Sequence, residues 1–578
     1  MTDRSTVRGW SLGAVSLLAT ATLVGLTLRH REWNEIFFIH STYYVLLAMV
    51  LVYAGVRLSG YREREPLRAW IKDNIAGIAV TAAVSAVVLV AVPPSFRVLA
   101  DETNLLGVSK NLYFKHTADF AVTGKWYFEN YWPLNEVTDR RPALFSFLVS
   151  LLHVVRGYHP ENAFHLNAIL FVLFVFSSYR LAKCLGGELF GVAAAIAVAV
   201  TPNTLVAARS GGFDFLAIFL LLVTIQSFHD YAKEPSPRLL AILSLNLCLF
   251  ANVRYEGWAL LVVSAVMLVA LRLVKRTSFR GFGFVYALVP LFLVPRYWQT
   301  VAKADDWEQP LSKSLFKISA FFENGRQYLG VMRHPLAFDG PHPPLLMMLA
   351  VGGGALLVRE VVRAVRERNA LQVRLALFVA ALLGVETVIS FTYIWGQPLH
   401  PASARLFVWL DTFVAFAAAW FLTAMGRRFA VPLVVLGRRS GAPLTVPACL
   451  TLLAMYLPGA SEARFINALI LTRQAAQTWR FFETLGQKQI LILSDRPGLF
   501  TVMDYGAVDI SLAEENRGLL VELSRHLYRD IYLVQEVDLE TKQPLPAFVG
   551  WSDVETETVL EFQNSDSQSI RIARVKKE

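Results

Sequence analysis

Charged residues are scarce in this sequence. Only 17% of the 578 residues are Asp, Glu, Lys or Arg, whereas an ordinary soluble protein has about 25%. Hydrophobic residues make up 55% of the chain, and the mean hydropathy is +0.45. This balance argues against a soluble globular enzyme and predicts a multi-pass membrane protein.

Cysteine and the common nucleotide motifs are also scarce or missing. The three cysteines, Cys184, Cys248 and Cys449, lie far apart in or beside apolar segments and form no CxxC pair. We expect small buried apolar side chains there, not a disulfide or a metal site. The chain has no GxGxxG and no GxxxxGK[ST], so a nucleotide site has little support. We find no internal repeat.

The positive charge does not indicate a nucleic-acid partner. The formal net charge is +10, but the chain is acidic after residue 460, so the basic excess lies before it. Short basic loops separate the apolar runs at 57–72, 272–280, 359–369 and 426–439. Basic loops of a membrane protein face the cytoplasm. We therefore predict a plasma (inner) membrane protein with its N terminus inside and its C terminus outside.

Apolar windows of bilayer-crossing length, about 17–25 residues, recur along the chain. We predict about thirteen spans from windowed hydropathy. Their approximate ranges are 10–28, 36–56, 74–92, 164–179, 188–206, 214–230, 237–253, 257–273, 281–298, 343–359, 373–395, 405–425 and 442–459. The apolar stretch 429–437 is too short to cross.

The expected fold class is mainly α: a multi-pass transmembrane helical bundle with a small C-terminal extracytoplasmic α/β domain. Residues 1–73 would add two N-terminal helices and a basic cytoplasmic loop. Residues 74–459 would form the membrane domain, with interfacial helices in the aromatic segment 93–163 and in 299–342. Residues 460–578 would form the α/β domain. There "KQILILSDRPG" predicts a strand ending in a turn, "DIYLVQEV", "ETVLEFQ" and "SIRIARV" predict strands, and "QTWRFFETLGQ" and "AEENRGLLVELSRHL" predict helices.

Ionisable residues at the outer ends of the predicted spans are candidates for function, because charges at a bilayer are costly. In the thirteen-span arrangement they would converge on one external cavity. They are Asp101, Glu102, Arg140, Arg141, Arg209, Asp214, Arg254, Glu256, His400 and Arg405.

Each candidate also has a structural interpretation. Asp101 and Glu102 could mark a solvated helix start, and Asp214 could cap a helix after the Gly211–Gly212 turn. Arg254 and Glu256 could form a local ion pair. A single histidine such as His400 is more often structural than catalytic, and Arg140–Arg141 could face lipid headgroups. Asp411, further along, could pair with a neighbour.

The order of the motifs resembles the GT-C membrane glycosyltransferases, in the branch of protein O-mannosyltransferases and the lipid A aminoarabinose transferase. The resemblance covers about residues 74–425. It rests on "ADE" (100–102), "RRPALFSFLVSLLHVVRG" (140–157), "RSGGFDFLAIFLLL" (209–222), "NVRYEGW" (252–258) and "HPASARLFVWLDTFVAF" (400–416). Two departures are visible: Arg–Arg–Pro stands for the family's Lys–Pro–Pro-like motif, and no second acid flanks Asp214 in a DxD arrangement.

The resemblance implies transfer of a sugar from a polyprenyl-phosphate carrier to a protein, lipid or polysaccharide acceptor outside the cytoplasm. Asp101 would be the general base of an inverting transfer, and Glu102 would support it. Arg141, Arg254 and Arg405 would bind the donor phosphate, while Asp214, Arg209, Tyr255 and His400 would orient the substrates. No obligate cofactor is predicted. A divalent metal, if used, would be held by Asp101, Glu102 and Asp214.

Two other functions stay open. A transporter or flippase of a lipid-linked or anionic substrate would favour inverted repeats and charges near the bilayer midplane. A non-catalytic assembly or sensor protein would act through the C-terminal domain, but it would leave the ordered acids and arginines unexplained.

Overall fold

The computed structural model divides the chain into two compact units. The first comprises residues 1–94, 141–145 and 164–465, and the second comprises 95–140, 146–163 and 466–578. The described residues are 4–30, 32–60, 66–127, 130–271, 273, 282–301, 315–428, 431–435, 438–442, 444–461, 470–515, 526–541, 543–545, 555–563 and 568–576. Most of the predicted basic loop 272–280, part of the predicted loop 299–342 and most of the predicted helix at 513–527 lie outside them.

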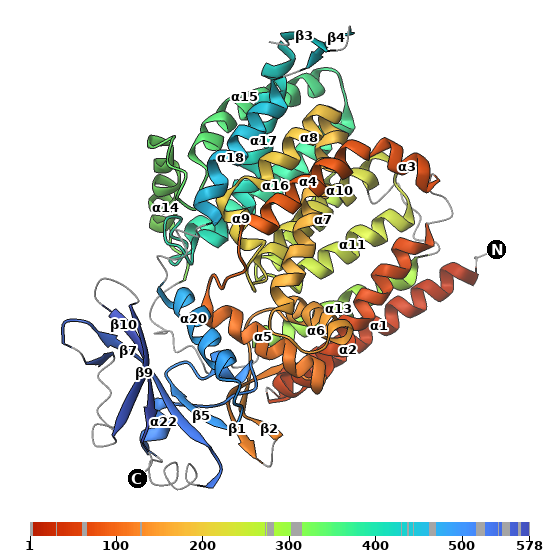
Figure 1. Cartoon of the computed structure of the whole chain (residues 1–578). Coiled ribbons are helices and arrows are strands. Elements are labelled where there is room, and N and C mark those ends of the chain that lie inside the picture. Colours follow the sequence, from red (N-terminus) through yellow and green to blue (C-terminus); the bar gives the residue numbers. More distant parts are fainter. Residues whose placement is uncertain are drawn as a thin grey trace. The chain divides into compact units, whose positions relative to one another are not determined.

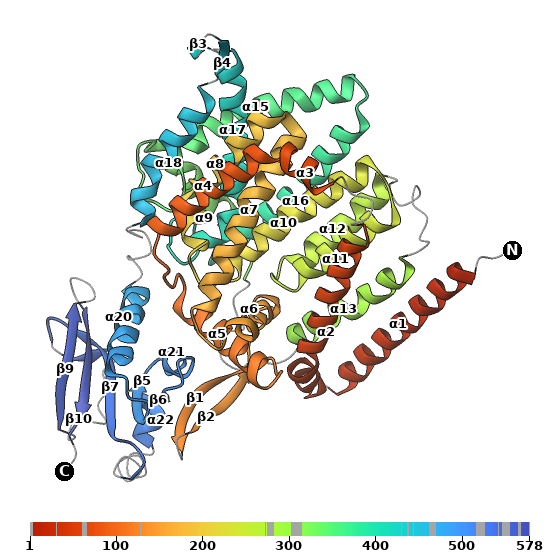
Figure 2. The same cartoon turned by 45° about the vertical axis from the view of Figure 1, so that its right-hand side comes forward.

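The first unit is helical (Figures 1 and 2). Its helices are α1 (Arg4–Arg29), α2 (Glu32–Ser59), α3 (Leu67–Asp73), α4 (Ile75–Ala91), α7 (Asn162–Gly186), α8 (Glu188–Ala199), α9 (Pro202–Ala207), α10 (Asp214–Lys233), α11 (Pro237–Ala251), α12 (Gly257–Ala270), α13 (Gly283–Val301), α14 (Ile318–Gly330), η3 (Val331–Arg333), α15 (Pro344–Arg366), α16 (Ala370–Thr392), η4 (Ala404–Phe407), α17 (Val408–Arg428) and α18 (Thr445–Ser461). A two-stranded hairpin of β3 (Val431–Val435) and β4 (Arg438–Ala442) precedes α18.

Each of the thirteen predicted spans overlaps a helix in the sequence, but the count of thirteen crossings is not confirmed. Among the described residues, six helices are long and apolar enough to cross a membrane: α2, α7, α10, α15, α16 and the continuous run of η4 and α17. The bent pair α3 and α4 would make seven. These are the helices of an integral membrane protein.

Several predicted spans contain helices that are too short to cross a bilayer, because the helix ends before the apolar run does. The predicted span 188–206 contains α8, which has 12 residues, or about 18 Å at 1.5 Å per residue. The chain then breaks at Thr201, and α9 begins with Pro202 in its first turn. Proline has no backbone N–H to continue a preceding helix, and it suits the first turn of a new one.

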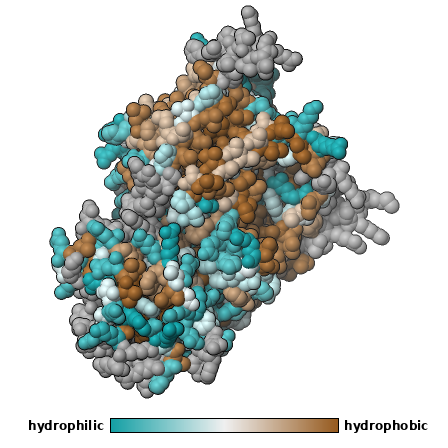
Figure 3. Space-filling view, viewed as in Figure 1, coloured by the Kyte–Doolittle hydropathy of each residue, from teal (hydrophilic) through white to brown (hydrophobic). Residues whose placement is uncertain are grey.

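The apolar surface of the first unit suits a lipid environment. Many large apolar side chains are exposed on its helices, such as Val90, Val266, Val351 and Leu18. In Figure 3 brown residues gather over these helices. Cys248 and Cys449 are buried as predicted, whereas Cys184 is exposed, and none of the three forms a disulfide.

The second unit combines helices with a sheet. Its helices are α5 (Leu99–Phe114), α6 (Leu144–Arg156), α20 (Ile470–Leu485), α21 (Gly498–Thr501) and α22 (Ile510–Glu515). Its strands are β1 (Asp119–Tyr127), β2 (Asn130–Thr138), β5 (Ile490–Ser494), β6 (Gly506–Asp509), β7 (Asp530–Asp538), β8 (Pro544–Leu545), β9 (Thr556–Gln563) and β10 (Gln568–Val575). The four predicted strands correspond to β5, β7, β9 and β10, and α20 contains all but the last two residues of the predicted helix "QTWRFFETLGQ".

The sheet joins two distant parts of the chain in the order β2-β1-β6-β5-β7-β10-β9, with β8 beside β7 (Figure 2). Strands β6, β5 and β7 run parallel, and every residue of β5 is buried. The hairpin β1–β2 comes from the aromatic segment 93–163 and meets β6 at Gly124 and Ala507.

The hairpin was not expected from the sequence, which predicted interfacial helices throughout 93–163. The segment has helices α5 and α6, but "KWY" and "NYW" between them form paired strands, with Trp126 opposite Tyr131. Aromatic residues favour strands as well as membrane interfaces. The second unit therefore differs from the predicted division at residue 460, because residues 95–140 and 146–163 group with the C-terminal strands.

Candidate functional site

Asp214 is the first residue of α10 and directly follows a tight turn. Asn167 of α7 donates to the carbonyls of Ser210 and Gly212 at 2.7 and 2.8 Å, which fixes the turn. Phe213, not Asp214, occupies the N-cap position, and no side chain caps the helix. Asp214 is only 7% exposed. Because its carboxylate does not cap the helix, it is available for another role.

Arg254 and Glu256 lie in the short connection between α11 and α12. The Glu256 carboxylate accepts two hydrogen bonds from Arg254, at 3.0 Å from Nε and 2.7 Å from Nη2. The connection is tight at Gly257, where a Cβ would lie 2.5 Å from the Cα of Ala251. The backbone thus places both charges together at the end of α11.

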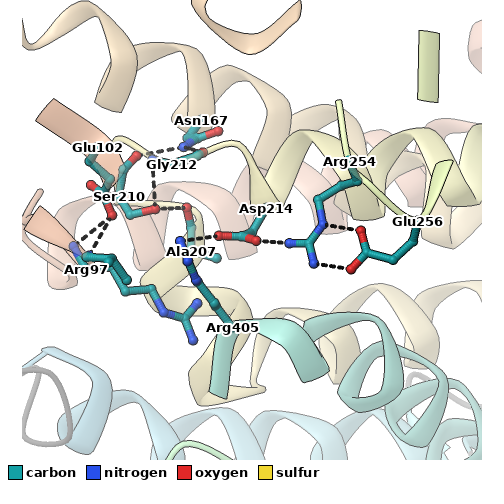
Figure 4. Close-up of polar contacts among 11 residues, drawn as sticks. Arg97, Glu102, Asn167, Ala207, Ser210, Gly212, Asp214, Arg254, Glu256 and Arg405 are labelled. Carbon is teal, nitrogen blue, oxygen red and sulfur yellow. Dashed lines mark hydrogen bonds and ion pairs between the residues drawn. The ribbon is translucent and has the colours of Figure 1, made fainter. Parts of the chain in front are cut away.

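Asp214 lies between two arginines, which Figure 4 shows. Arg254 donates from Nη1 to Oδ1 of Asp214. On the other side, Nη1 of Arg405 in η4 lies 3.6 Å from Oδ2. Four charges from three separate stretches of sequence therefore form one partly buried cluster: Asp214, Arg254, Glu256 and Arg405.

Arg254 and Glu256 each favour the charged form of the other. Burial opposes charge on Arg254, but Glu256 and Asp214 raise its guanidinium pKa above the ordinary value. Burial likewise opposes ionisation of Glu256, but Arg254 holds its pKa below the usual range. Pairing keeps such shielded side chains in their charged forms. Fixed charges that are shielded from water act strongly on a charge that develops nearby.

Two further charged residues near the cluster were missed from the sequence. Glu386 of α16 is 5% exposed and interacts electrostatically with Arg254. Arg296 of α13 is also 5% exposed, and its guanidinium lies 4.8 Å from the centre of the Tyr255 ring. Each is an isolated ionisable residue inside an apolar run, a signal that the sequence does contain.

The remaining predicted residues of the first unit lie at connections between helices. Arg209 donates to the carbonyl of Val92 at 2.8 Å. The carbonyl of Arg141 accepts from Gln299 of α13. Tyr255 is half-exposed beside Arg296, and His400 is exposed in the turn that leads to Ala404. These four assignments stay predictions.

Asp101 and Glu102 belong to the second unit, in the first turn of α5. Glu102 is buried, and its Oε1 accepts from the backbone N–H groups of Arg97 and Val98 at 2.9 and 3.0 Å. This carboxylate therefore stabilises the start of α5 (Figure 4). The predicted convergence of all these residues on one cavity, and their predicted roles, stay predictions.

The described residues contain no group of three His, Cys, Asp or Glu side chains placed to hold a metal ion. An open pocket of about 530 Å³ lies in the first unit between α14 and the start of α15. Its lining includes Arg326, Arg333, His334 and His342.

Solved structures share the fold, although no family model and no curated protein matches the sequence. ArnT from Cupriavidus metallidurans in the apo state is 12% identical, with a TM-score of 0.50 over 86% of this chain and 97% of that one. The same protein bound to undecaprenyl phosphate is 13% identical, with a TM-score of 0.46 over 88% and 98%.

The archaeal oligosaccharyltransferase AglB from Archaeoglobus fulgidus, in complex with an inhibitory peptide and a dolichol-phosphate, is 12% identical. Its TM-score is 0.46 over 82% of this chain and 70% of that one. ArnT and AglB are both GT-C glycosyltransferases. The match to apo ArnT extends over nearly its whole length, so this chain has the GT-C fold that its motifs predicted.

Proposed function

We propose that this protein is a membrane glycosyltransferase that takes a sugar from a polyprenyl-phosphate carrier and passes it to an acceptor outside the cytoplasm. The observation that carries the proposal is the partly buried cluster of Asp214, Arg254, Glu256 and Arg405 in a chain with the GT-C fold. ArnT, which has this fold, binds undecaprenyl phosphate.

The chemistry explains why arginines are needed. When the bond between the anomeric carbon and the phosphate oxygen breaks, the leaving polyprenyl phosphate gains one negative charge. Guanidinium groups bind phosphate oxygens in a bidentate manner and stabilise that charge as it develops. Arg405 and Arg254 are our principal candidates, with Arg141 as the third.

Asp214 would hold these arginines in place before the donor arrives. Arg254 contacts both Asp214 and Glu256, so its guanidinium is fixed in one orientation. Such preorganisation removes the cost of reorienting the charges during the reaction. Arg209, Tyr255 and His400 would orient the substrates, and a divalent metal is not required by this scheme.

Asp101 would act as the general base. It would remove the proton from the acceptor hydroxyl while the hydroxyl oxygen attacks the anomeric carbon in line with the departing phosphate, which inverts the configuration. Glu102 would contribute indirectly, because it stabilises the helix that carries Asp101. The N terminus would be cytoplasmic and the second unit extracytoplasmic, as the basic loops predict.

The test is transfer by purified protein in lipid vesicles. Wild type, Arg405→Gln and Arg427→Gln would receive radiolabelled polyprenyl-phosphate sugars and candidate acceptors, and released polyprenyl phosphate would be counted. Arg427 is the matched control. It is an exposed arginine in the last turn of α17, far along the helix from η4, and it donates a hydrogen bond to the carbonyl of Gly186.

We expect Arg405→Gln to lower turnover about 100-fold or more and Arg427→Gln to retain it. Movement of the intact lipid-linked sugar across the vesicle, without cleavage, would instead support a flippase. Equal turnover by wild type and Arg405→Gln would show that Arg405 does not stabilise the leaving phosphate.

A further inference from the structure

A second buried charge cluster in the first unit surrounds Asp411, in the first turn of α17. The Asp411 side chain is fully buried. Its carboxylate accepts from Nδ1 of His342 at 2.9 Å, from the Tyr328 hydroxyl at 2.8 Å and from Nδ2 of Asn203 at 2.9 Å. These three donors come from the segment before α15, from α14 and from α9.

Both ring nitrogens of His342 are hydrogen-bonded. Nδ1 lies 2.9 Å from Oδ2 of Asp411, and Nε2 lies 2.9 Å from the carbonyl oxygen of Pro398. A carbonyl oxygen can only accept, so Nε2 donates to Pro398. His342 and Asp411 form a salt bridge whose two side chains are completely buried.

Stability alone does not explain such a pair. Desolvation of two ions offsets most of their mutual attraction, and well-packed apolar residues often serve equally well. A buried ion pair can instead specify one arrangement of the segments that it joins. Here the joined segments lead directly to the candidate phosphate site.

The connection runs through Asn203. Its Nδ2 group donates both to Asp411 and, at 2.7 Å, to the carbonyl oxygen of Ala404. Ala404 immediately precedes Arg405 in the single turn η4, and α17 follows at once. His342 holds the chain before this turn at Pro398, and Asp411 holds it after the turn, so the turn that carries Arg405 is fixed from both sides.

We propose that His342 and Asp411 are positioning residues whose buried ion pair, acting through Asn203, orients Arg405 toward Asp214 and the donor phosphate. The link to phosphate rests on the proposed function. The orientation of the Ala404–Phe407 turn does not, because it concerns only contacts within the first unit.

The test compares the double variant His342→Gln/Asp411→Asn with Thr412→Val. The double variant removes both charges together and leaves neither ion unpaired. Thr412 is the matched control, because its buried hydroxyl donates only within its own helix, to Val408 at 2.8 Å. The single change Asn203→Ala keeps His342 beside Asp411 but removes both Asn203 hydrogen bonds, to Asp411 and to Ala404, so it tests the connection if the double variant folds poorly.

Two measurements decide the outcome. Amide hydrogen exchange over 398–407 should accelerate about tenfold or more in the double variant and in Asn203→Ala, but not in Thr412→Val. In the transfer assay, kcat should fall about 10- to 100-fold, with a smaller change in KM for the donor, because a misoriented Arg405 stabilises the developing phosphate charge less well.

Unchanged exchange in the double variant and in Asn203→Ala would overturn the positioning role. Faster exchange with an unchanged kcat would overturn the link to the donor phosphate. If wild type transfers no sugar from any donor, the proposed function fails, and hydrogen exchange alone then decides whether His342 and Asp411 orient the turn.

Discussion

Asp214 shows what a single residue can and cannot reveal in a sequence. Its place after two glycines fits a helix cap, yet Phe213 holds that position and Asp214 faces two arginines. The sequence could nominate Asp214, Arg254 and Arg405 because charges are rare at apolar ends. It could not reveal that His342, 69 residues from Asp411, forms an ion pair with it, because that contact depends on the packing of α17.

A second buried histidine, His153, is hydrogen-bonded to neutral side chains. His153 of α6 is fully buried in the second unit. Asn162 donates to its Nδ1 at 2.8 Å, so the proton lies on Nε2, which is 3.2 Å from the Ser109 hydroxyl. Burial lowers the pKa of His153 to about 4, and the ring is neutral in the folded protein at pH 7.

This pKa predicts an acid-sensitive second unit. Between about pH 6.5 and pH 4 the unfolded chain binds a proton at His153 and the folded chain does not, so stability falls as pH falls. Over that window the loss should approach about 3 kcal/mol. Denaturant unfolding at pH 7 and pH 4.5 would measure it, with His153→Gln as the non-titrating control. The prediction is wrong if wild type and His153→Gln lose equal stability.

At the scale of elements, hydropathy predicted where helices lie better than how many cross the membrane. Helices α8, α11 and α12 have 12, 15 and 14 residues, and an apolar composition alone does not make them span. The strands of the C-terminal part were predictable from their alternating and β-branched residues. The hairpin β1–β2 was not, because its aromatic residues suit an interface helix equally well.

The packing of α15 against α17 gives a prediction at this scale. A Cβ on Gly353 would lie 1.9 Å from the carbonyl oxygen of Ala417, whereas a Cβ on Gly354 would meet no atom within 4 Å. Close approach of helices in a membrane depends on such small residues. Gly353→Ala should cost about 1–3 kcal/mol or more, and the neighbouring Gly354→Ala should not destabilise the protein.

Thermal unfolding in detergent would compare the two alanine variants directly. Because α17 begins immediately after the turn that carries Arg405, Gly353→Ala should also lower sugar transfer. Equal melting temperatures for Gly353→Ala and Gly354→Ala would show that α15 and α17 do not pack in this register.

At the scale of the whole molecule, the chain alternates between its two units. The second unit takes α5 and the hairpin from between the first unit's helices and completes its sheet with strands that follow residue 489. Lys110 of α5 pairs with Asp504 at 2.6 Å and donates to the carbonyl of Thr501 at 2.7 Å. The segment that carries Asp101 is therefore folded together with the C-terminal part, and no local pattern in the sequence indicates this long-range pairing.

The proposed mechanism depends most on Asp101 as the base of a sugar transfer, and one measurement tests that role. Wild type and the isosteric variant Asp101→Asn, matched in melting temperature, would be given the same radiolabelled polyprenyl-phosphate sugar and acceptor. We predict that product formation falls about 100- to 10,000-fold in the variant, because a carboxamide cannot accept the acceptor's proton. Equal product formation by a well-folded Asp101→Asn protein would contradict the mechanism.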